Sequence, residues 1–348
     1  MPNNTNHPTK DRTNHRKALS QLVQSGVLPT QNIEQALRIS NITPTNHAWK
    51  NFLSNLLLWL GVVALSSSVM FFIAYNWNDL GRFAKFGLVE VLIAIAVLVY
   101  WKTNKNDSST SSSKFKSTNL ISQAALLVAS LLLGVLLAFY GQTYQTGADT
   151  WELFLTWCIL IIPWTIIARF PALWLVWLSL LNLSIIFYLE TFRGVFGFIF
   201  YSETNLLWTL AIVNSTALIV WELLENRFEW LSESWAIRII AIAAGTPLTF
   251  LVIESTFNRY SSILLPTLIW VAGMIAVYIV YRKIKIDLFM LAMACLSGIS
   301  VIISFAGKVL FDVLRGEIGA FLFLAILVIS LGAASAIWLK KVHKEQLT

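Results

Sequence analysis

The sequence predicts an all-α, polytopic integral membrane protein with about ten transmembrane helices and a small N-terminal cytosolic helical cap. Hydrophobic residues make up 57% of the chain and charged residues only 12%, whereas charged residues reach about 25% in soluble domains. The mean hydropathy is +0.69. The apolar residues gather in blocks of about 18–22, the length of helix that crosses roughly 30 Å of hydrocarbon. Since the backbone finds no water there, each block should be α-helical.

The N-terminal region is polar and precedes all of these blocks. Residues 1–14 are rich in Asn, Thr and Pro and are expected to be a disordered tail. Residues 15–50 are expected to form an amphipathic cytosolic cap containing two short helices, the first ending near Gly26 and the second covering about residues 30–39. The cap either binds a partner or packs on the first spans.

Ten apolar blocks follow and divide into two halves. Five spans fill a first membrane half, residues 51–189, and five more fill a second half, residues 190–348, which ends in a short basic tail. The apolar segment at residues 192–201 is too short to cross the bilayer, and an interfacial or re-entrant position is expected. The ten blocks are residues 56–75, 83–101, 120–140, 153–168, 172–189, 206–223, 235–253, 262–281, 286–306 and 318–339.

The distribution of Lys and Arg predicts the orientation. If the N-terminus is cytoplasmic, nineteen of the 25 Lys and Arg residues fall on the cytoplasmic side. An even number of spans then places both termini in the cytoplasm. The expected location is a bacterial cytoplasmic (inner) membrane, and the lipid bilayer is the expected partner.

Several functional classes lack support. The basic residues lie at helix ends and not on a face interleaved with aromatic residues, so no nucleic-acid partner is expected. All four His residues lie near the termini, and the two Cys residues are far apart, which predicts no metal site and no cofactor. An enzyme is disfavoured because no nucleophile–base pair accompanies the spans.

Two polar loops on the outer side are the main candidates for a binding site. Residues 74–82 and 140–151 both combine amides, aromatic rings, an acid and glycine. They could gather a cation or a polyhydroxylated headgroup, but capping of the neighbouring helices alone explains these residue types and is favoured. The candidate binding residues are Asn76, Trp77, Asn78, Asp79, Arg82, Gln142, Tyr144, Gln145, Asp149 and Glu152.

Glu90 is the clearest polar candidate within the hydrocarbon. It lies about seven residues into the second span, roughly 10 Å deep at 1.5 Å per residue. Desolvation disfavours a charged carboxylate, so Glu90 is expected to bind a proton or pair with a donor. A proton- or cation-coupled site and a structural contact between helices both remain open.

Other polar and helix-breaking residues have simpler expectations. Asn182 in the fifth span and Asn214 in the sixth are expected to form interhelical hydrogen bonds. Pro163 should kink the fourth span, and residues 245–247 are the best candidate for a locally unwound segment. Gly134 and other small residues should allow close helix approach.

Three groups of residues carry a resemblance to a known family. They are residues 25–28, the end of the first span at residues 72–77, and residues 141–149 preceding a span with Trp157 and Pro163. Over roughly residues 16–170 the chain resembles an uncharacterised family of prokaryotic multi-pass membrane proteins, a domain of unknown function. The resemblance implies a membrane protein and no particular activity.

Two functional hypotheses follow. The first is a transporter or permease-like protein for a small or lipid-linked solute, with a solute or lipid headgroup as ligand. The alternative is a non-catalytic membrane scaffold or envelope-stress sensor that acts through the N-terminal cytosolic cap.

The predicted orientation is testable by cysteine accessibility. A cysteine at Thr146 should react with a membrane-impermeant reagent added from outside, and one at Ser111 should react only from inside. The reverse labelling pattern would contradict the orientation.

Overall fold

The computed structural model is helical in nearly all of the residues that it describes. These are residues 22–23, 25, 29, 32, 36, 46–106, 114–192, 203–225, 227–231, 233–258, 262–314 and 318–347. Within them there is no strand, and ten helices are long and apolar enough to cross a membrane. The predicted fold class and number of spans are therefore confirmed. The two helices predicted in the cap, and residues 193–201 of the predicted re-entrant segment, lie outside the described residues apart from a few positions.

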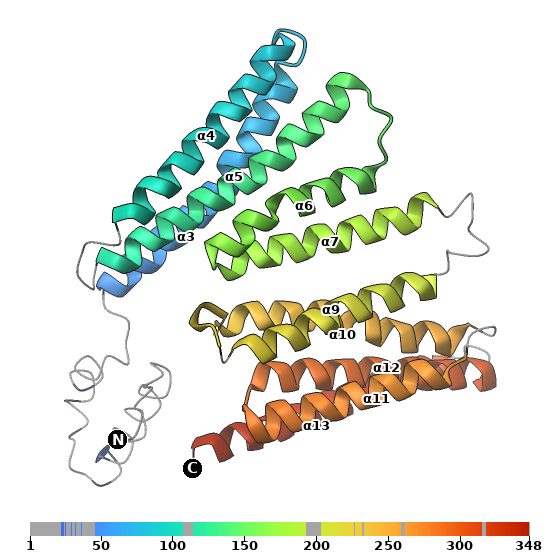
Figure 1. The fold of residues 1–348 in the computed structure, drawn as a ribbon. Helices are drawn as coiled ribbons and strands as arrows, with labels where there is room; N and C mark the ends of the chain where they lie inside the picture. The colour runs from blue at the N-terminus through green and yellow to red at the C-terminus, as the bar shows by residue number, and fades with distance from the viewer. Residues whose placement is uncertain are drawn as a thin grey trace. The chain divides into compact units, whose positions relative to one another are not determined.

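Figure 1 shows the described helices coloured in chain order. Their bounds are α3 (Asn46–Tyr75), α4 (Arg82–Asn106), α5 (Lys114–Tyr144), α6 (Thr150–Ala168), α7 (Pro171–Thr191), α9 (Glu203–Glu225), the 3₁₀ turn η3 (Glu229–Leu231), α10 (Ser234–Phe257), α11 (Leu264–Tyr278), the π-helical turn η4 (Ile279–Ile284), α12 (Leu288–Leu314) and α13 (Ile318–Leu347).

The chain divides into two compact units. The first comprises residues 1–64 and 343–348, and the second comprises residues 65–342. In the first unit, Trp49 and Phe52 near the start of α3 pack edge to face, with ring centroids 5.9 Å apart.

Helices that follow each other in sequence pair within the second unit. Close pairs are α4 with α5, α6 with α7, and α9 with α10 (Figure 1). Helix α5 also contacts α6, and α10 contacts both α11 and α12. The most buried spans are α5 and α10, and the least buried is α13. The apolar side chains that remain exposed on the spans are positioned to face lipid.

A close approach of α5 to α6 depends on Gly134. A Cβ atom at this position would overlap the indole ring of Trp157 on α6. The same indole is held in place because its Nε1 donates to Ser130 O on α5, at 2.8 Å. The expected close approach is therefore confirmed at Gly134, and it joins the first three spans of the chain to the fourth.

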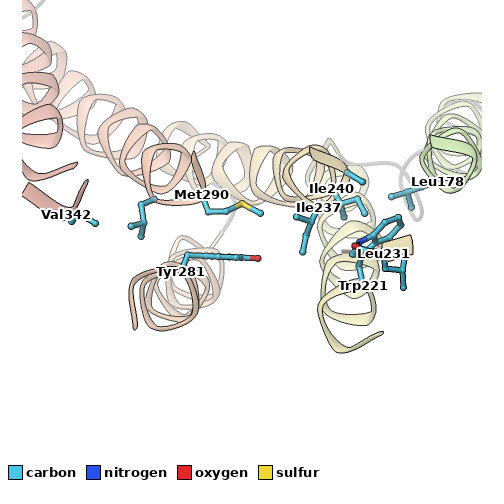
Figure 2. Packing of buried hydrophobic residues seen from close by; sticks show 10 residues of the cluster. Leu178, Trp221, Leu231, Ile237, Ile240, Tyr281, Met290 and Val342 are labelled. Atoms are coloured by element: carbon cyan, nitrogen blue, oxygen red, sulfur yellow. The ribbon is translucent and has the colours of Figure 1, made fainter. Parts of the chain in front are cut away.

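A hydrophobic core joins α7, α9, α10, η4, α12 and α13. Figure 2 shows its labelled side chains, Leu178, Trp221, Leu231, Ile237, Ile240, Tyr281, Met290 and Val342. Trp221 Nε1 donates to Leu231 O at 3.2 Å, so the turn η3 is tied back onto α9. The Tyr281 hydroxyl is directed away from η4, toward the helices that carry Trp221 and Ile237 (Figure 2).

The predicted interhelical amide contact is present. Asn182 Nδ2 donates to Asn214 Oδ1 at 3.0 Å, and Asn214 Nδ2 donates to Asn182 Oδ1 at 2.7 Å. Each Nδ2 also donates to a backbone carbonyl one turn earlier, at 2.8 Å. The two amides therefore satisfy each other between α7 and α9, as polar groups in hydrocarbon must.

The unwound segment predicted at residues 245–247 is wrong. Helix α10 continues through Pro247 without interruption. Thr249 Oγ1 donates to Gly245 O at 2.7 Å and lies 2.6 Å from Ser297 Oγ on α12. Hydroxyl side chains and neighbouring helices of this kind accommodate proline in membrane helices, which is why the break does not form. Helix α6 also runs on through Pro163, and the kink predicted there remains a prediction.

Replacing Gly134 with alanine should destabilise the protein. The added methyl group would collide with Trp157 and force α5 and α6 apart, at a cost of about 1–3 kcal/mol. The measurement is the thermal unfolding midpoint of the purified protein in detergent.

Gly332→Ala on α13 is the matched control, since a Cβ at that glycine meets no atom within 4 Å. It should leave stability unchanged or slightly higher because alanine is the better helix former. Equal effects of the two substitutions would show that the α5–α6 contact is not as close as described.

Candidate functional site

The loop between α3 and α4 contains the first group of predicted binding residues. Asn76 Nδ2 donates to Phe72 O at 2.8 Å, so this amide caps the end of α3. The backbone N–H of Asp79 donates to Asn76 O at 3.2 Å. The side chains of Asn78, Asp79 and Arg82 are exposed. These contacts explain how the loop is held and leave its role in binding a prediction.

Trp77 lies in the same loop and packs inward. Its ring centroid is 5.9 Å from that of Phe139 on α5, and it belongs to the hydrophobic cluster formed by α3, α4 and α5. The ammonium group of Lys85 lies over the Trp77 ring, 3.6 Å from the centroid.

The second predicted loop is shorter than expected. Helix α5 continues to Tyr144, so Gln142 and Tyr144 lie on its last turn, and Glu152 lies in the first turn of α6. Helix α5 is extended by packing, because Tyr144 stacks on Phe86 of α4 with ring centroids 6.0 Å apart. Tyr144 of the second predicted loop therefore packs on α4, while Trp77 of the first packs on Phe139 of α5.

The turn between α5 and α6 tests whether its polar side chains cap the neighbouring helices. Gln145 and Gly147 have φ angles of 45° and 66°, the left-handed region in which glycine is strain-free. Asp149 occupies the N-cap position of α6, but its side chain makes no capping hydrogen bond. Gln142, Gln145, Asp149 and Glu152 are exposed, and their role in binding remains a prediction.

Glu90 does not make the contact predicted for it. Its side chain is exposed on α4, while the neighbouring Val89 is fully buried. In the part of the chain that the structure describes, no hydrogen bond or ion pair involves the Glu90 carboxyl. The alternative in which Glu90 pairs with a donor is therefore not observed in the described residues, because α4 packs through the face that carries Val89. The alternative of a proton- or cation-coupled site stays a prediction.

A cluster of charged groups that the sequence analysis did not single out joins α9 to η4. Lys285 Nζ donates to Glu222 Oε2 and to Glu225 Oε2, both at 2.6 Å. The hydroxyl of Tyr281 donates to Glu222 Oε1 at 2.5 Å. The π-helical turn brings Tyr281 and Lys285 onto the same carboxylate. We call these four residues the glutamate–lysine cluster.

A second ion pair lies at the start of α12. Arg238 of α10 donates through Nε and Nη2 to Asp287 Oδ2, at 3.1 and 2.9 Å. The other oxygen of Asp287 accepts the backbone N–H of Phe289 at 2.8 Å, so Asp287 also caps α12. The Arg238 guanidinium lies over the Phe289 ring, 5.3 Å from its centroid. Contacts within the protein therefore explain the charged side chains of the glutamate–lysine cluster and of the Arg238–Asp287 pair.

The Lys285 ammonium shows how the glutamate–lysine cluster balances its charges. Burial lowers the pKa of Lys285, but hydrogen bonds to Glu222 and Glu225 outweigh burial and raise the pKa above its ordinary value of 10.5. A lysine whose pKa is raised by folding contributes its full stabilisation below pH 10.5, and loses it only as the pH rises through the raised pKa. The ion pairs therefore stabilise the protein throughout the physiological range.

A polar pocket with unpaired positive charge lies between α4, α5, α6 and the turn after α9. Its volume is about 880 Å³. Arg169, Arg227 and several neutral polar side chains form the polar wall of the pocket. Ile166 and Ile167, which are 58% and 57% exposed, form its apolar wall. Among the residues whose side chains the structure describes, the lining contains no carboxylate. These lining residues are Tyr100, Asn104, Ser122, Gln123, Ile166, Ile167, Ala168, Arg169, Arg227, Phe228 and Trp230. We call this the arginine pocket.

The backbone at Arg169 is unusual. Arg169 ends α6 in the left-handed conformation, with φ 47° and ψ 45°. Glycine is the usual residue at such a helix end, because other residues are strained there. Phe170 is extended and buried, and Pro171 begins α7, so the turn has little freedom to relax. An arginine in a strained position at the rim of a pocket is an indication of function.

The other side of the arginine pocket is positioned by stacked indoles. The Trp230 ring stacks on Trp174 of α7 and meets Trp221 of α9 edge on, with centroids 6.3 Å away in both cases. The backbone N–H of Arg227 donates to Leu224 O at 2.8 Å. Neither Arg169 nor Arg227 forms an ion pair within the described residues, so both guanidinium groups are available to an anion.

Sequence reasoning missed the arginine pocket because it assigned its arginines only to membrane orientation. The turn at Arg169 carried one usable signal: a helix that ends before Phe-Pro without a glycine. Nothing in the sequence indicated that this turn and Arg227 lie at the same pocket, since nearly sixty positions separate them, among them the described helices α7 and α9.

The fold and these sites define a polytopic α-helical membrane protein. Residues 20–174 match the family model described as "Predicted membrane protein (DUF2157)", which confirms the predicted resemblance to an uncharacterised multi-pass membrane family. The match includes α4, α5 and Arg169 and ends before Arg227. No curated protein matches the chain, and no solved structure does.

Replacing Lys285 with methionine should lower stability at pH 7. The substitution leaves the carboxylates of Glu222 and Glu225 facing each other without the ammonium group between them. After allowing for the partial exposure of Lys285, we expect a loss of about 1 kcal/mol. The measurement is the thermal unfolding midpoint in detergent, and Glu225→Gln in the same chain should restore part of the loss.

Lys283→Met is the matched control, since Lys283 is exposed two positions earlier and forms no ion pair within the described residues. It should leave the midpoint nearly unchanged. A Lys285 variant as stable as the Lys283 variant would contradict a stabilising role of the cluster.

Proposed function

We propose that this chain is a permease-like protein of a bacterial cytoplasmic membrane that binds an anionic, lipid-linked solute in the arginine pocket. The observation that carries the proposal is that Arg169 and Arg227 line one pocket of about 880 Å³, in which the described lining residues include no carboxylate. Guanidinium groups bind phosphate through two parallel hydrogen bonds, and the volume lies within the usual range of ligand sites.

The apolar wall of the pocket supports a lipid-linked ligand over a free one. Ile166, Ile167 and Phe228 are 58%, 57% and 45% exposed and line the pocket beside the two arginines. An amphiphile would place its charged headgroup at the guanidinium groups and its chain against these residues. On the predicted orientation the pocket opens at the cytoplasmic side, where basic pockets between helices bind anionic headgroups.

Two features of the sequence, Glu90 and the segment at residues 245–247, support transport less directly. Glu90 is exposed on α4, and α10 is continuous, so neither marks a path through the membrane. Movement of the solute is therefore proposed from the pocket alone. Translocation is tested by following a headgroup-labelled anionic lipid across proteoliposomes that contain the full chain, with Glu90→Gln and Asp149→Asn as comparisons.

The scaffold or envelope-stress sensor hypothesis depends on the cap at residues 15–50. Most of that region lies outside the described residues, so the hypothesis remains a prediction. Deleting residues 1–45 should abolish a cellular phenotype and leave membrane insertion intact if it holds.

Replacing Arg169 with glycine should separate binding from folding. Loss of the guanidinium should weaken retention of phosphatidylglycerol about tenfold, the effect of losing roughly 1.4 kcal/mol, which is typical of a charge-assisted hydrogen bond. Thermal stability should stay the same or rise, because glycine is unstrained in the left-handed conformation. The measurement is the affinity of the purified full chain for phosphatidylglycerol and for phosphatidylcholine in nanodiscs.

Arg227→Gln should weaken phosphatidylglycerol binding similarly, and Lys341→Gln on exposed α13 is the control that should not. If phosphatidylglycerol and phosphatidylcholine bind equally well, or if Arg169→Gly and Arg227→Gln bind like the unmodified chain, the proposal is wrong.

A further inference from the structure

Lys85 is a buried lysine near the opposite end of α4 from the arginine pocket. It lies in the first turn of α4, and its relative exposure is only 6%. Lysine is almost never buried to this extent unless an acidic partner is present, since removing an ammonium group from water is costly.

The surroundings of Lys85 are aromatic. Its ammonium nitrogen lies 3.6 Å from the centroid of the Trp77 ring, and Trp77 is held by Phe139 at 5.9 Å. The next residue, Phe86, stacks on Tyr144 at the end of α5. The Trp77 ring, which packs on Phe139, therefore positions the cation.

The Trp77 ring satisfies only part of what an ammonium group requires. A lysine ammonium has three N–H donors, and a ring face engages one side of it. Within the described residues, no carboxylate and no other hydrogen-bond acceptor is found for Lys85. Lys85 Nζ is not among the fully enclosed side-chain atoms that lack a partner in the described residues. The side of the ammonium group that faces away from Trp77 is therefore accessible, and no acceptor from the described part of the protein occupies it.

The helix position increases the excess of positive charge. The N-terminus of a helix carries a partial positive charge and free backbone N–H groups, which disfavour a nearby cation and favour an anion. Lys85 lies in that first turn, and the exposed Arg82 begins it. An anion bound there would supply the missing acceptors and reduce the repulsion together.

We propose that Lys85, Trp77 and the N-terminal turn of α4 form a second anion site that binds a phosphate group. A helix N-terminus next to a lysine is a recurrent arrangement for phosphate. Tryptophan residues at span ends lie at the depth of the lipid headgroups, where lipid phosphates are found. The phosphate comes from an anionic phospholipid or from inorganic phosphate, and the test distinguishes them.

The first measurement is the thermal unfolding midpoint of the full chain carrying Arg169→Gly and Arg227→Gln, so that the arginine pocket does not contribute. Phosphatidylglycerol in mixed micelles should raise the midpoint by about 2–4 °C at roughly ten times its Kd, and phosphatidylcholine should not. An equal rise with inorganic phosphate alone would identify a free-phosphate site, and a rise only with phosphatidylglycerol would identify a lipid site.

Substitution of Lys85 tests the residue directly. Lys85→Met should keep or raise stability without ligand, since it removes a largely buried ammonium group that has no acceptor from the protein, and should abolish most of the ligand-induced rise. Lys85→Arg, which keeps the charge, should retain part of the rise and provides a second variant if Lys85→Met does not fold.

Lys308→Met is the matched control. Lys308 is half-buried on α12, and its ammonium group already donates to the carbonyl of Thr256. Its loss should lower stability without ligand and leave the ligand-induced rise unchanged. The proposal is overturned if neither phosphatidylglycerol nor phosphate raises the midpoint, or if Lys85→Met responds as strongly as the chain with Lys85.

Discussion

The absence of water in the hydrocarbon core is the constraint on which this structure depends. It requires every backbone N–H and C=O group in the bilayer to be paired within the protein, and the spans therefore form helices even through Pro163 and Pro247. The absence of water imposes the same requirement on polar side chains within the bilayer. The amides of Asn182 and Asn214 satisfy each other across two helices, so these polar groups are explained by packing and need no ligand.

The same constraint makes the unsatisfied charges informative. In the glutamate–lysine cluster, each carboxylate has a donor within hydrogen-bond distance, and the cluster ties helix ends together. Arg169, Arg227 and Lys85 differ because no acidic partner accompanies them in the described residues. Two are exposed at a pocket and one is buried against an aromatic wall, which is why the proposals concern anions at both ends of α4.

Glu90 shows that the depth of a residue in a span does not reveal its contacts unless the packing of the helix is known. Its depth in the second span indicated a desolvated carboxyl that either binds a proton or pairs with a donor, yet the buried face of α4 is that of Val89. One residue of helix corresponds to about 100° of rotation, so adjacent positions face different environments. The outer loops show the complementary case, since Tyr144 belongs to a longer α5 that its stacking on Phe86 supports.

The sequence by itself determined the class of protein, the number of spans and the places where they begin and end to within a few residues in most cases. These depend on apolar block length, a property of the chain read locally. Only the tertiary structure decided which polar groups meet. Lys285 reaches Glu222 and Glu225 from another helix, and Arg169 and Arg227 line one pocket, because the rotation and pairing of the helices bring distant residues together.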